Sequence, residues 1–205
     1  MLIVARHGRT AANAAGRLLG RGDPPLDAVG EQQATAIAAA LDADRVVSSP
    51  LRRCRETAAA LGRPVELDER LIEIDYGELE GMPLGEVPAE WWGAWRGDPA
   101  WRPPGGETLD ELAARVEAAL GDLVGDAATG DVVVVSHVSP IKAAVAWALG
   151  VGIDISWRCR VDQASITRLA VGAGGPSLRS FNEVAHLVSV VDAAVPDGTS
   201  TPGSG

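Results

Sequence analysis

The sequence predicts an α/β fold with a mostly parallel sheet, and two observations support this prediction. Short runs rich in β-branched residues alternate with longer segments in which apolar residues recur at helical spacing. The 205 residues are 46% hydrophobic and 22% charged, as in ordinary globular domains, and this length suits one core rather than two. We therefore expect a single α/β domain.

Four short apolar runs are expected to form the parallel part of the sheet. They are residues 2–5, 45–48, 65–67 and 132–136. The last run is the most apolar and is therefore expected at the centre, because inner strands of a parallel sheet are covered on both faces. Two later runs, residues 165–171 and 178–181, flank a glycine-rich turn at 172–176 and are expected to close the sheet as a hairpin.

Helices are expected between these strands. After Leu26 an apolar stripe predicts the first helix; it consists of Val29, Ala34, Ile37, Ala38 and Leu41. Ser49 followed by Pro50 is typical of a capped helix start, and the sequence predicts that this second helix runs through Leu61.

Two more helices have stronger boundary signals. Thr108 and Glu111 form a capping-box pattern, after which apolar residues recur at helical spacing as far as Leu123. Another helix is expected over residues 140–149, directly after the central strand, and Gly150 is expected to end it.

The composition changes near the C-terminus, where Pro, Gly, Ser and Thr dominate from Ala193 onward. We therefore expect one folded domain over residues 1–192 and a disordered tail over 193–205. At the other end, residues 2–5 are too short for the apolar core of a signal peptide, and no apolar run approaches the roughly 20 residues that a membrane-spanning helix needs. The expected location is cytoplasmic, without a membrane partner.

Charge and cysteine content narrow the classes of partner. The formal net charge of -10 argues against a nucleic-acid partner, because such binding relies on Lys and Arg neutralising phosphates. Arginines nevertheless concentrate in residues 6–21 and 52–55, where they are expected to form a local positive pocket for a small anion. Cys54 and Cys159 lie far apart and lack a metal-ligand spacing, so reduced thiols are expected.

Two of the three histidines follow directly after predicted strands, at the edge where open α/β sheets bind ligands. His7 lies in the segment Arg6-His7-Gly8-Arg9-Thr10, with Asn13 shortly after it, and His137 follows the central strand. An arginine fork suits phosphate oxygens, an imidazole nitrogen can attack phosphorus, and glycine lets a ligand approach the backbone. Taken alone, His7 is equally compatible with a buried ring that only packs.

Further motifs follow in the order found in a known family. They are Ser49-Pro50-Leu51-Arg52-Arg53, the block Leu71, Glu73, Gly77, Glu80 and Gly81, the turn Gly105-Gly106-Glu107, and Ser136-His137. Together with the segment around His7 they resemble the motifs of the histidine phosphatase superfamily, also called the phosphoglycerate-mutase-like family. The resemblance spans residues 2 to about 170 and implies a three-layer sandwich, in which helices flank a mostly parallel central sheet.

The resemblance also implies a role for each matching residue. His7 would carry a covalent phosphoryl group, Arg6, Arg53 and His137 would bear on the phosphoryl oxygens, and Glu73 would donate and later accept the proton. The implied substrate is a small phosphorylated metabolite. Neither a metal nor another cofactor is expected, because the sequence contains no Walker loop, carboxylate cluster or Cys/His cage.

Asn13, Arg21 and Ser139 are expected to contact the substrate. Arg21 stands where the family often has glutamine, so a substrate contact and a solvent-exposed side chain both stay open. Val138 is a departure from the pattern, since glycine commonly follows the second histidine in the family.

Three activities stay open under this resemblance. Mutases of the family carry a long insertion where this chain has only residues 82–104, so we prefer a phosphatase to a phosphoglycerate mutase; a non-catalytic phosphate-binding relative is the third alternative. The same stretch holds Trp91, Trp92, Trp95 and Trp101, which either form an aromatic wall for a bulky leaving group or pack a lid helix onto the domain, and we favour packing. A homodimer is left open, and the sequence does not reveal the natural substrate.

Overall fold

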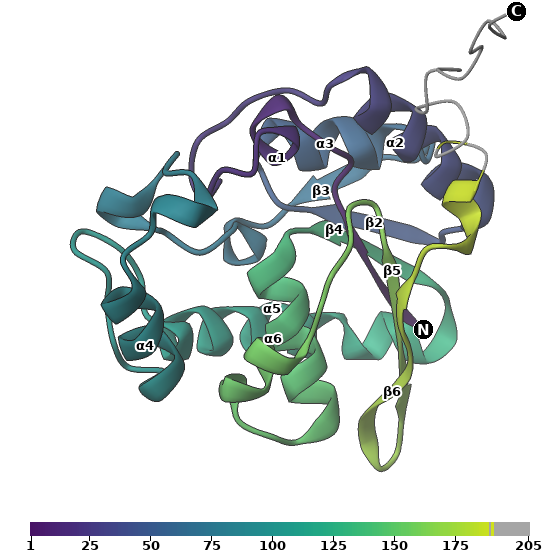
Figure 1. The fold of residues 1–205 in the computed structure, drawn as a ribbon. Helices are drawn as coiled ribbons and strands as arrows, with labels where there is room; N and C mark the ends of the chain where they lie inside the picture. Colours follow the sequence, from purple (N-terminus) through teal and green to yellow (C-terminus); the bar gives the residue numbers. More distant parts are fainter. Residues whose placement is uncertain (189, 191–205) are drawn as a thin grey trace, which may run out of the picture.

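The computed structural model describes residues 1–188 and 190, and it confirms the α/β fold and the three layers (Figure 1). One six-stranded sheet has the strand order β3-β2-β4-β1-β5-β6. Its strands are β1 (Leu2–Arg6), β2 (Arg45–Ser48), β3 (Val65–Leu67), β4 (Val132–Ser136), β5 (Ile166–Gly172) and β6 (Gly175–Glu183). The strands β1 to β4 run parallel to one another, whereas β5 is antiparallel to β1 and pairs with β6 as the expected hairpin.

The helices lie between and beside these strands. They are α1 (Ala11–Ala14), α2 (Ala28–Ala40), α3 (Arg52–Ala59), α4 (Ala89–Gly97), α5 (Leu109–Thr129) and α6 (Val138–Leu149). Short 3-10 turns cover Glu69–Leu71, Gly77–Leu79, Leu84–Glu86, Ile153–Arg158 and Ala185–Leu187.

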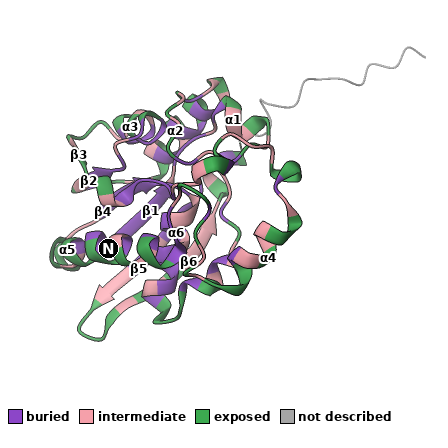
Figure 2. Ribbon diagram, turned by 90° about the vertical axis from the view of Figure 1, so that its left-hand side faces the viewer, coloured by how far each residue is buried: buried purple, intermediate pink, exposed green. Residues whose placement is uncertain are grey.

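The alternation of apolar side chains along β1 explains why the sheet is covered on both faces. Leu2 and Val4 pack in the large cluster that also contains the apolar residues of α5 and α6. Ile3 packs with residues of α3, and Ala5 packs with Ile37 of α2. Figure 2 shows β1 and β4 buried between these helices. Period-two side-chain alternation therefore produces the three-layer arrangement.

The register of the two central strands determines where the histidines lie. Arg6 of β1 is paired with Ser136 of β4, and the two strands are parallel. His7 and His137 therefore leave neighbouring strands at the same level, and the backbone N–H of His7 donates to the carbonyl of Ser136 at 3.0 Å. The carboxyl edge of the sheet thus brings together two residues that are 130 positions apart in the sequence.

Several local predictions are confirmed. The Thr108 hydroxyl accepts a hydrogen bond from the Glu111 backbone N–H, and the Glu111 carboxylate accepts one from the Thr108 N–H, as a capping box requires. Gly150 follows α6 with φ of 65°, the left-handed conformation that glycine adopts without strain. Residues 132–136 form β4, one of the two central strands.

The prediction that Ser49 caps the second helix is wrong. α3 begins at Arg52, its N-cap is Leu51, and no side chain caps it. The Ser49 hydroxyl instead lies 2.7 Å from Nε2 of His137, so a tertiary partner took precedence over the local capping rule. α6 also begins earlier than expected, at Val138, which places Pro140 in the first turn, where a helix leaves its N–H groups unpaired anyway.

The predicted domain boundary at residue 192 and the predicted tail over 193–205 lie outside the described residues. None of the helices in the described part of the chain combines the length and the apolarity that crossing a bilayer requires.

Two glycines let the segment after β1 lie directly against α2. A Cβ on Gly8 would lie 2.4 Å from the carbonyl oxygen of Gly30, and a Cβ on Gly30 would lie 2.1 Å from the carbonyl oxygen of Arg9. Both distances are too short for any side chain, and the opposing atoms are backbone. This contact holds the residues that follow His7 beside α2, while the Gly8 N–H donates to the Thr57 hydroxyl of α3 at 3.0 Å.

Replacing Gly30 with Ala is therefore expected to lower the free energy of unfolding by about 1–3 kcal/mol, because the added methyl group overpacks a backbone contact. Gly121 in α5 is the matched control, since a Cβ there would meet nothing within 4 Å. Gly121→Ala should raise stability by about 0.5–1 kcal/mol through helix propensity alone. Urea unfolding of both variants measures the two effects, and equal stabilisation by both substitutions would contradict the close contact.

Candidate active site

A cavity of about 420 Å³ opens at the carboxyl ends of β1 and β4, and we call it the His7 cavity. It brings together side chains from the segment after β1, the loop before α4, the start of α6 and the loop before β5. Its lining consists of Arg6, His7, Asn13, Arg17, Leu18, Leu19, Glu73, Tyr76, Leu84, Val138, Lys142, Cys159, Arg160 and Val161. Four of the predicted site residues, Arg6, His7, Asn13 and Glu73, are therefore in one cavity.

His7 is held in one tautomer. Its side chain is 3% exposed, and Nδ1 lies 2.7 Å from the carbonyl oxygen of Gly8. Because a carbonyl oxygen only accepts hydrogen bonds, Nδ1 carries the proton and the lone pair of the neutral ring is on Nε2. Burial, followed by the positive charges of Arg53 and Arg6, lowers the pKa of His7 well below its usual value. The site therefore holds an unprotonated imidazole nitrogen at neutral pH.

Two arginines place positive charge next to His7, and no carboxylate of the described residues lies within ion-pair distance of either, although the charge of Glu73 acts on both. Arg53 is completely buried, and its guanidinium donates to the carbonyl oxygens of Gly22 and Gly20 at 2.7 and 2.8 Å. Arg6 donates to the carbonyl of Val161 at 2.8 Å, while its Nε is buried without a partner. Among the described residues neither guanidinium forms an ion pair, although burial lowers the pKa of each. The positive charge of both side chains would attract an anion into the cavity.

His137 packs edge-on against His7, with ring centroids 5.1 Å apart, and is completely buried. Arg53 Nε donates to Nδ1 of His137 at 3.2 Å, so the proton of the neutral ring is on Nε2, which donates to the Ser49 hydroxyl at 2.7 Å. Both ring nitrogens are thus engaged, and His137 does not line the His7 cavity. Its predicted contact with a phosphoryl oxygen requires the Nε2–H to exchange Ser49 for the ligand.

Glu73 is fixed from two directions. Its carboxylate accepts hydrogen bonds from the backbone N–H groups of Ile74 at 2.9 Å and of Ser139 at 3.2 Å, and its side chain is 3% exposed. Arg115 of α5 donates to the backbone carbonyls of Ile72 and Glu73 at 2.7 and 3.3 Å. These contacts hold a carboxyl group on the wall of the cavity that contains the His7 imidazole.

The three predicted substrate-binding residues differ in their position relative to the His7 cavity. Asn13 lines the cavity, and its Oδ1 accepts hydrogen bonds from the N–H and hydroxyl of Thr10, which leaves its Nδ2 group as the donor. Ser139 supplies its backbone N–H to Glu73 rather than to the cavity. Arg21 does not line the cavity: its guanidinium lies 3.4 Å from Glu107, and the side chain is 38% exposed. The structure thus brings only Asn13 of the three into direct contact with the space.

The sequence analysis did not identify Tyr76, Lys142 or Arg160 as site residues, although all three line the cavity. A signal existed for two of them. Tyr76 lies in the same sequence block as Glu73. Lys142 follows Val138 by four residues, and this spacing places Val138 and Lys142 on one face of α6. Arg160 belongs to no motif, because the antiparallel strand β5 and the loop before it reach the site only through the tertiary fold.

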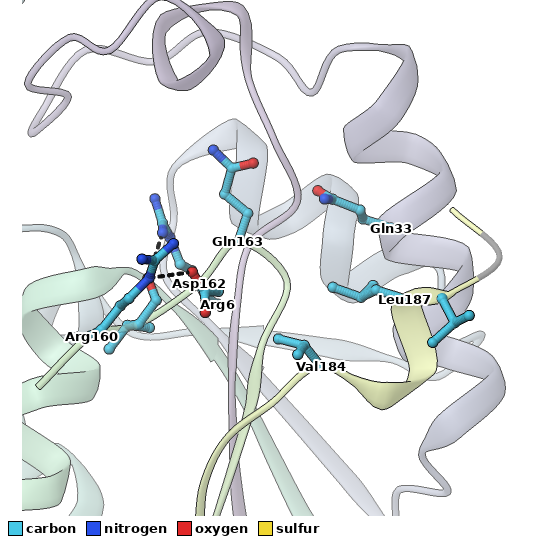
Figure 3. Close-up of a pocket in the computed structure, with 9 residues that line it drawn as sticks. Arg6, Gln33, Arg160, Asp162, Gln163, Val184 and Leu187 are labelled. Carbon is cyan, nitrogen blue, oxygen red and sulfur yellow. Dashed lines mark hydrogen bonds and ion pairs between the residues drawn. The ribbon is translucent and has the colours of Figure 1, made fainter. Parts of the chain in front are cut away.

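A larger groove of about 770 Å³ adjoins the cavity, and we call it the Arg160 groove (Figure 3). It shares Arg6, Arg160 and Val161 with the His7 cavity and extends past Gln33 of α2 toward Leu187. Arg160 Nε donates to Asp162 at 2.8 Å beside it. The groove is the larger of the two spaces, but the predicted catalytic residues His7 and Glu73 line only the smaller cavity.

In the described part of the chain, no group of three or more His, Cys, Asp or Glu side chains is arranged to hold a metal ion. Cys54 is buried beside His137, with its Sγ 3.3 Å from Nε2, and burial raises the pKa of its thiol above the usual value. This thiol is therefore protonated and unreactive at neutral pH.

A family model described as the histidine phosphatase superfamily (branch 1) matches residues 2–184. The chain belongs to this superfamily. The match covers the sheet, the His7 cavity and every predicted site residue, and it confirms the family expected from the motifs.

Relatives of the chain carry several names. It is 35% identical over 198 residues to the bifunctional protein Rv2228c of Mycobacterium tuberculosis, covering 91% of this chain but only 54% of that protein. It is 39% identical over 170 residues to glucosyl-3-phosphoglycerate phosphatase of Mycolicibacterium vanbaalenii, covering 75% of this chain and 76% of the relative. It is 34% identical over 201 residues to the probable phosphoglycerate mutase GpmB of Salmonella paratyphi C, covering 90% and 93%. The chain thus spans about half the length of the first of these relatives.

Solved structures of this superfamily share the fold. A phosphoserine phosphatase variant from Entamoeba histolytica, in complex with phosphoserine, superposes with a TM-score of 0.85 at 28% identity, covering 91% of this chain and 98% of the other. The shared architecture therefore extends over nearly the whole described chain.

The neutral state of the buried histidines predicts a pH dependence of stability. His7 and His137 have pKa values below the usual 6.5, which applies to the unfolded chain, so below pH 6.5 the unfolded state binds protons that the folded state does not. Above about pH 6.5 the two histidines therefore do not reduce the free energy of unfolding. Below that pH the free energy of unfolding falls by up to about 1.4 kcal/mol per pH unit for each histidine. Urea unfolding between pH 7.5 and 5.5 should show this loss, and His7→Asn should make the slope shallower. Identical slopes for the two proteins would contradict a buried neutral His7.

Proposed function

We propose that this chain is a metal-independent phosphomonoesterase that acts on small phosphorylated metabolites through a phosphohistidine on His7. The observation that carries the proposal is the His7 geometry: a buried neutral imidazole has its proton fixed on Nδ1 by Gly8, and its Nε2 lone pair borders a cavity. Nε2 attacks phosphorus as the bond to the leaving oxygen breaks, and an N–P bond replaces that P–O bond.

Arg6 and Arg53 supply the electrostatic part of the mechanism. In a loose transition state the charge spreads over the equatorial phosphoryl oxygens, and fixed cations that are already desolvated stabilise that charge without reorganising. Neither arginine forms an ion pair with a carboxylate of the described residues, so both charges stay available to the dianionic phosphoryl group. Asn13 Nδ2 adds a neutral donor from the same wall. His137 positions Arg53 and packs His7, and it reaches the phosphoryl group when its Nε2–H leaves Ser49.

Glu73 is the proposed proton donor and acceptor. In its acid form it protonates the departing alkoxide, and in its ionised form it takes a proton from the water that attacks the phosphohistidine. Release of inorganic phosphate then restores neutral His7. The two backbone N–H groups that fix the Glu73 carboxylate keep one group available for both half-reactions.

The proposal also includes a substrate class. Structural neighbours from Entamoeba histolytica were solved with phosphoserine and with 3-phosphoglyceric acid, which are both small phosphorylated acids. These complexes support a phosphorylated metabolite as the substrate of this chain. A cytoplasmic location stays a prediction from the sequence, and a homodimer stays an open alternative.

Trapping the intermediate tests the proposal. When turnover of a phosphomonoester labelled in the phosphoryl group is quenched, acid-labile, base-stable label should appear on the peptide that contains His7. His7→Asn should abolish the label, whereas the matched control His186→Asn should keep it, because His186 bonds to the Ala164 carbonyl away from the cavity. Label on a serine or cysteine, or a requirement for added metal after chelation, would overturn the mechanism.

A phosphoglycerate mutase is the second candidate, because relatives named GpmB align with 90% of this chain. Both reactions pass through a phosphohistidine, so product analysis separates them. With 3-phosphoglycerate as substrate we expect phosphate release to exceed formation of the 2-isomer, since the stretch of residues 82–104 is too short for the long insertion of the mutases. Interconversion that is faster than phosphate release and depends on a bisphosphate primer would identify a mutase.

Substrates with different leaving groups distinguish proton donation by Glu73 from a role in positioning. Glu73→Gln should slow phosphorylation of His7 by alkyl phosphates by about 10²–10⁴-fold and by nitrophenyl phosphate much less, because nitrophenolate departs without a proton. Single-turnover bursts isolate this step from the later hydrolysis. Glu78→Gln is the matched control, since Glu78 is exposed and lies outside the cavity. If Glu73→Gln slowed the burst phase equally with both substrate types, Glu73 would act only in positioning.

A further inference from the structure

A second pocket of about 150 Å³ adjoins the His7 cavity, and we call it the indole pocket. The two spaces share five lining residues, which are Leu18, Tyr76, Leu84, Val138 and Lys142. Ser139, whose backbone N–H holds Glu73, also lines the indole pocket. The pocket therefore begins beside the proposed proton donor, which is the side of the site where the leaving group departs.

Three indole rings form the wall of this pocket. Trp92 and Trp95 of α4 stack with centroids 6.0 Å apart, and Trp157 from the Ile153–Arg158 turn meets each of them at 6.1 Å, edge to face. The Arg96 guanidinium lies 5.8 Å from the Trp92 ring and 5.6 Å from the Trp157 ring. Such cation–π contacts hold the rings in place, so the wall is already formed before a ligand binds.

Trp91 and Trp101 have a packing role only. Trp91 and Trp101 lie 6.0 Å from each other and pack against the main apolar cluster, and neither lines the indole pocket. Trp95 belongs to the same cluster and Trp92 packs against it, so packing applies to all four tryptophans of this stretch. Only Trp92 and Trp95 of the four also line the indole pocket.

Two polar groups at this pocket lack partners in the described structure. Lys142, the only lysine of the chain, borders both spaces. Its side-chain amine makes no hydrogen bond or ion pair with the described residues, and burial lowers the pKa of this amine. Trp95 is 2% exposed, and its indole N–H is buried without an acceptor. An unpartnered buried donor costs stability unless a ligand satisfies it.

We propose that the indole pocket is the leaving-group subsite, and that it takes the phosphomonoester of a hydroxy acid bearing a compact ring with acceptor oxygens. The carboxylate of this substrate pairs with Lys142, the ring lies among Trp92, Trp95 and Trp157, and a ring oxygen accepts from the Trp95 N–H. This inference rests on the proposed phosphatase function and adds to it the chemistry of the alcohol.

The size of the pocket limits the ring. An apolar cavity of about 150 Å³ accommodates a group of roughly benzene size. One six-membered ring therefore fits, whereas a nucleoside or a second ring does not. Apart from Tyr76, Ser139 and Ser156 the remaining lining residues are apolar, among them Leu84, Leu109 and Ile153. None of them is charged, so the face of the ring rather than a second charge is recognised there.

The test compares kcat/KM for four phosphates: glycerol 3-phosphate, 3-phosphoglycerate, and the 2-O-cyclohexyl and 2-O-glucosyl derivatives of 3-phosphoglycerate. Each step in this series adds one recognised feature, namely the carboxylate, the ring and the ring oxygens. In the unaltered protein each of the first two steps should raise kcat/KM by about tenfold or more, and the glucosyl compound should exceed the cyclohexyl compound.

Variants assign each step to a residue. Trp92→Leu should remove most of the gain from the ring, and Lys142→Met should remove most of the gain from the carboxylate. Trp147→Leu is the matched control, because Trp147 lies on α6 and lines neither space, and it should keep both gains. The two variants report on different steps of the series, so each tests the proposal without the other.

The outcomes separate this inference from the proposed function. Phosphate release from all four compounds without a gain from the ring, or a gain that survives Trp92→Leu, would overturn the subsite and leave the phosphatase intact. A carboxylate gain that survives Lys142→Met would overturn the role of Lys142, and equal rates for the cyclohexyl and glucosyl compounds would overturn the role of the Trp95 N–H. No phosphate release from any compound, with no label on His7, would overturn the proposed function itself.

Discussion

The hydrogen bond from His7 Nδ1 to the carbonyl of Gly8 is the interaction on which the rest of the site depends. It fixes the proton of the neutral ring on the side away from the reaction and leaves the lone pair on Nε2. The charges of Arg53 and Arg6 lower the pKa of His7, and in the proposed mechanism they also attract a phosphoryl dianion. The same positive field would therefore bind the electrophile and keep the proposed nucleophile unprotonated.

The fold serves this arrangement through contacts that are distant in sequence. Parallel pairing of β1 with β4 places His7 and His137 side by side, and the backbone contact of Gly8 with Gly30 holds the segment after β1 against α2. On the opposite wall Arg115 fixes the backbone that carries Glu73. Each reacting group thus lies on or next to a regular element, which limits its motion relative to the others.

Local signals in the sequence predicted the elements and the residues that carry family motifs. The capping box at Thr108 and the valine run of β4 concern neighbours in the chain, and they appear in the structure as expected. Predictions failed or were missing where a tertiary contact decides the outcome. Ser49 forms a hydrogen bond with His137 instead of capping α3. Arg21 lies beside Glu107 and outside the His7 cavity, and its contact with a substrate stays a prediction. The indole pocket depends on Trp157, which no spacing connects to α4.

The tautomer of His7 tests the central claim most directly. The chain has only three histidines, so nitrogen-15 NMR can resolve each imidazole, with His7→Asn identifying the signal of His7. At pH 6.5 the account predicts a neutral His7 ring with its proton on Nδ1 and a neutral His137 ring with its proton on Nε2. A His7 ring that is protonated at this pH, or one that carries its proton on Nε2, would contradict a nucleophile prepared by the Gly8 carbonyl.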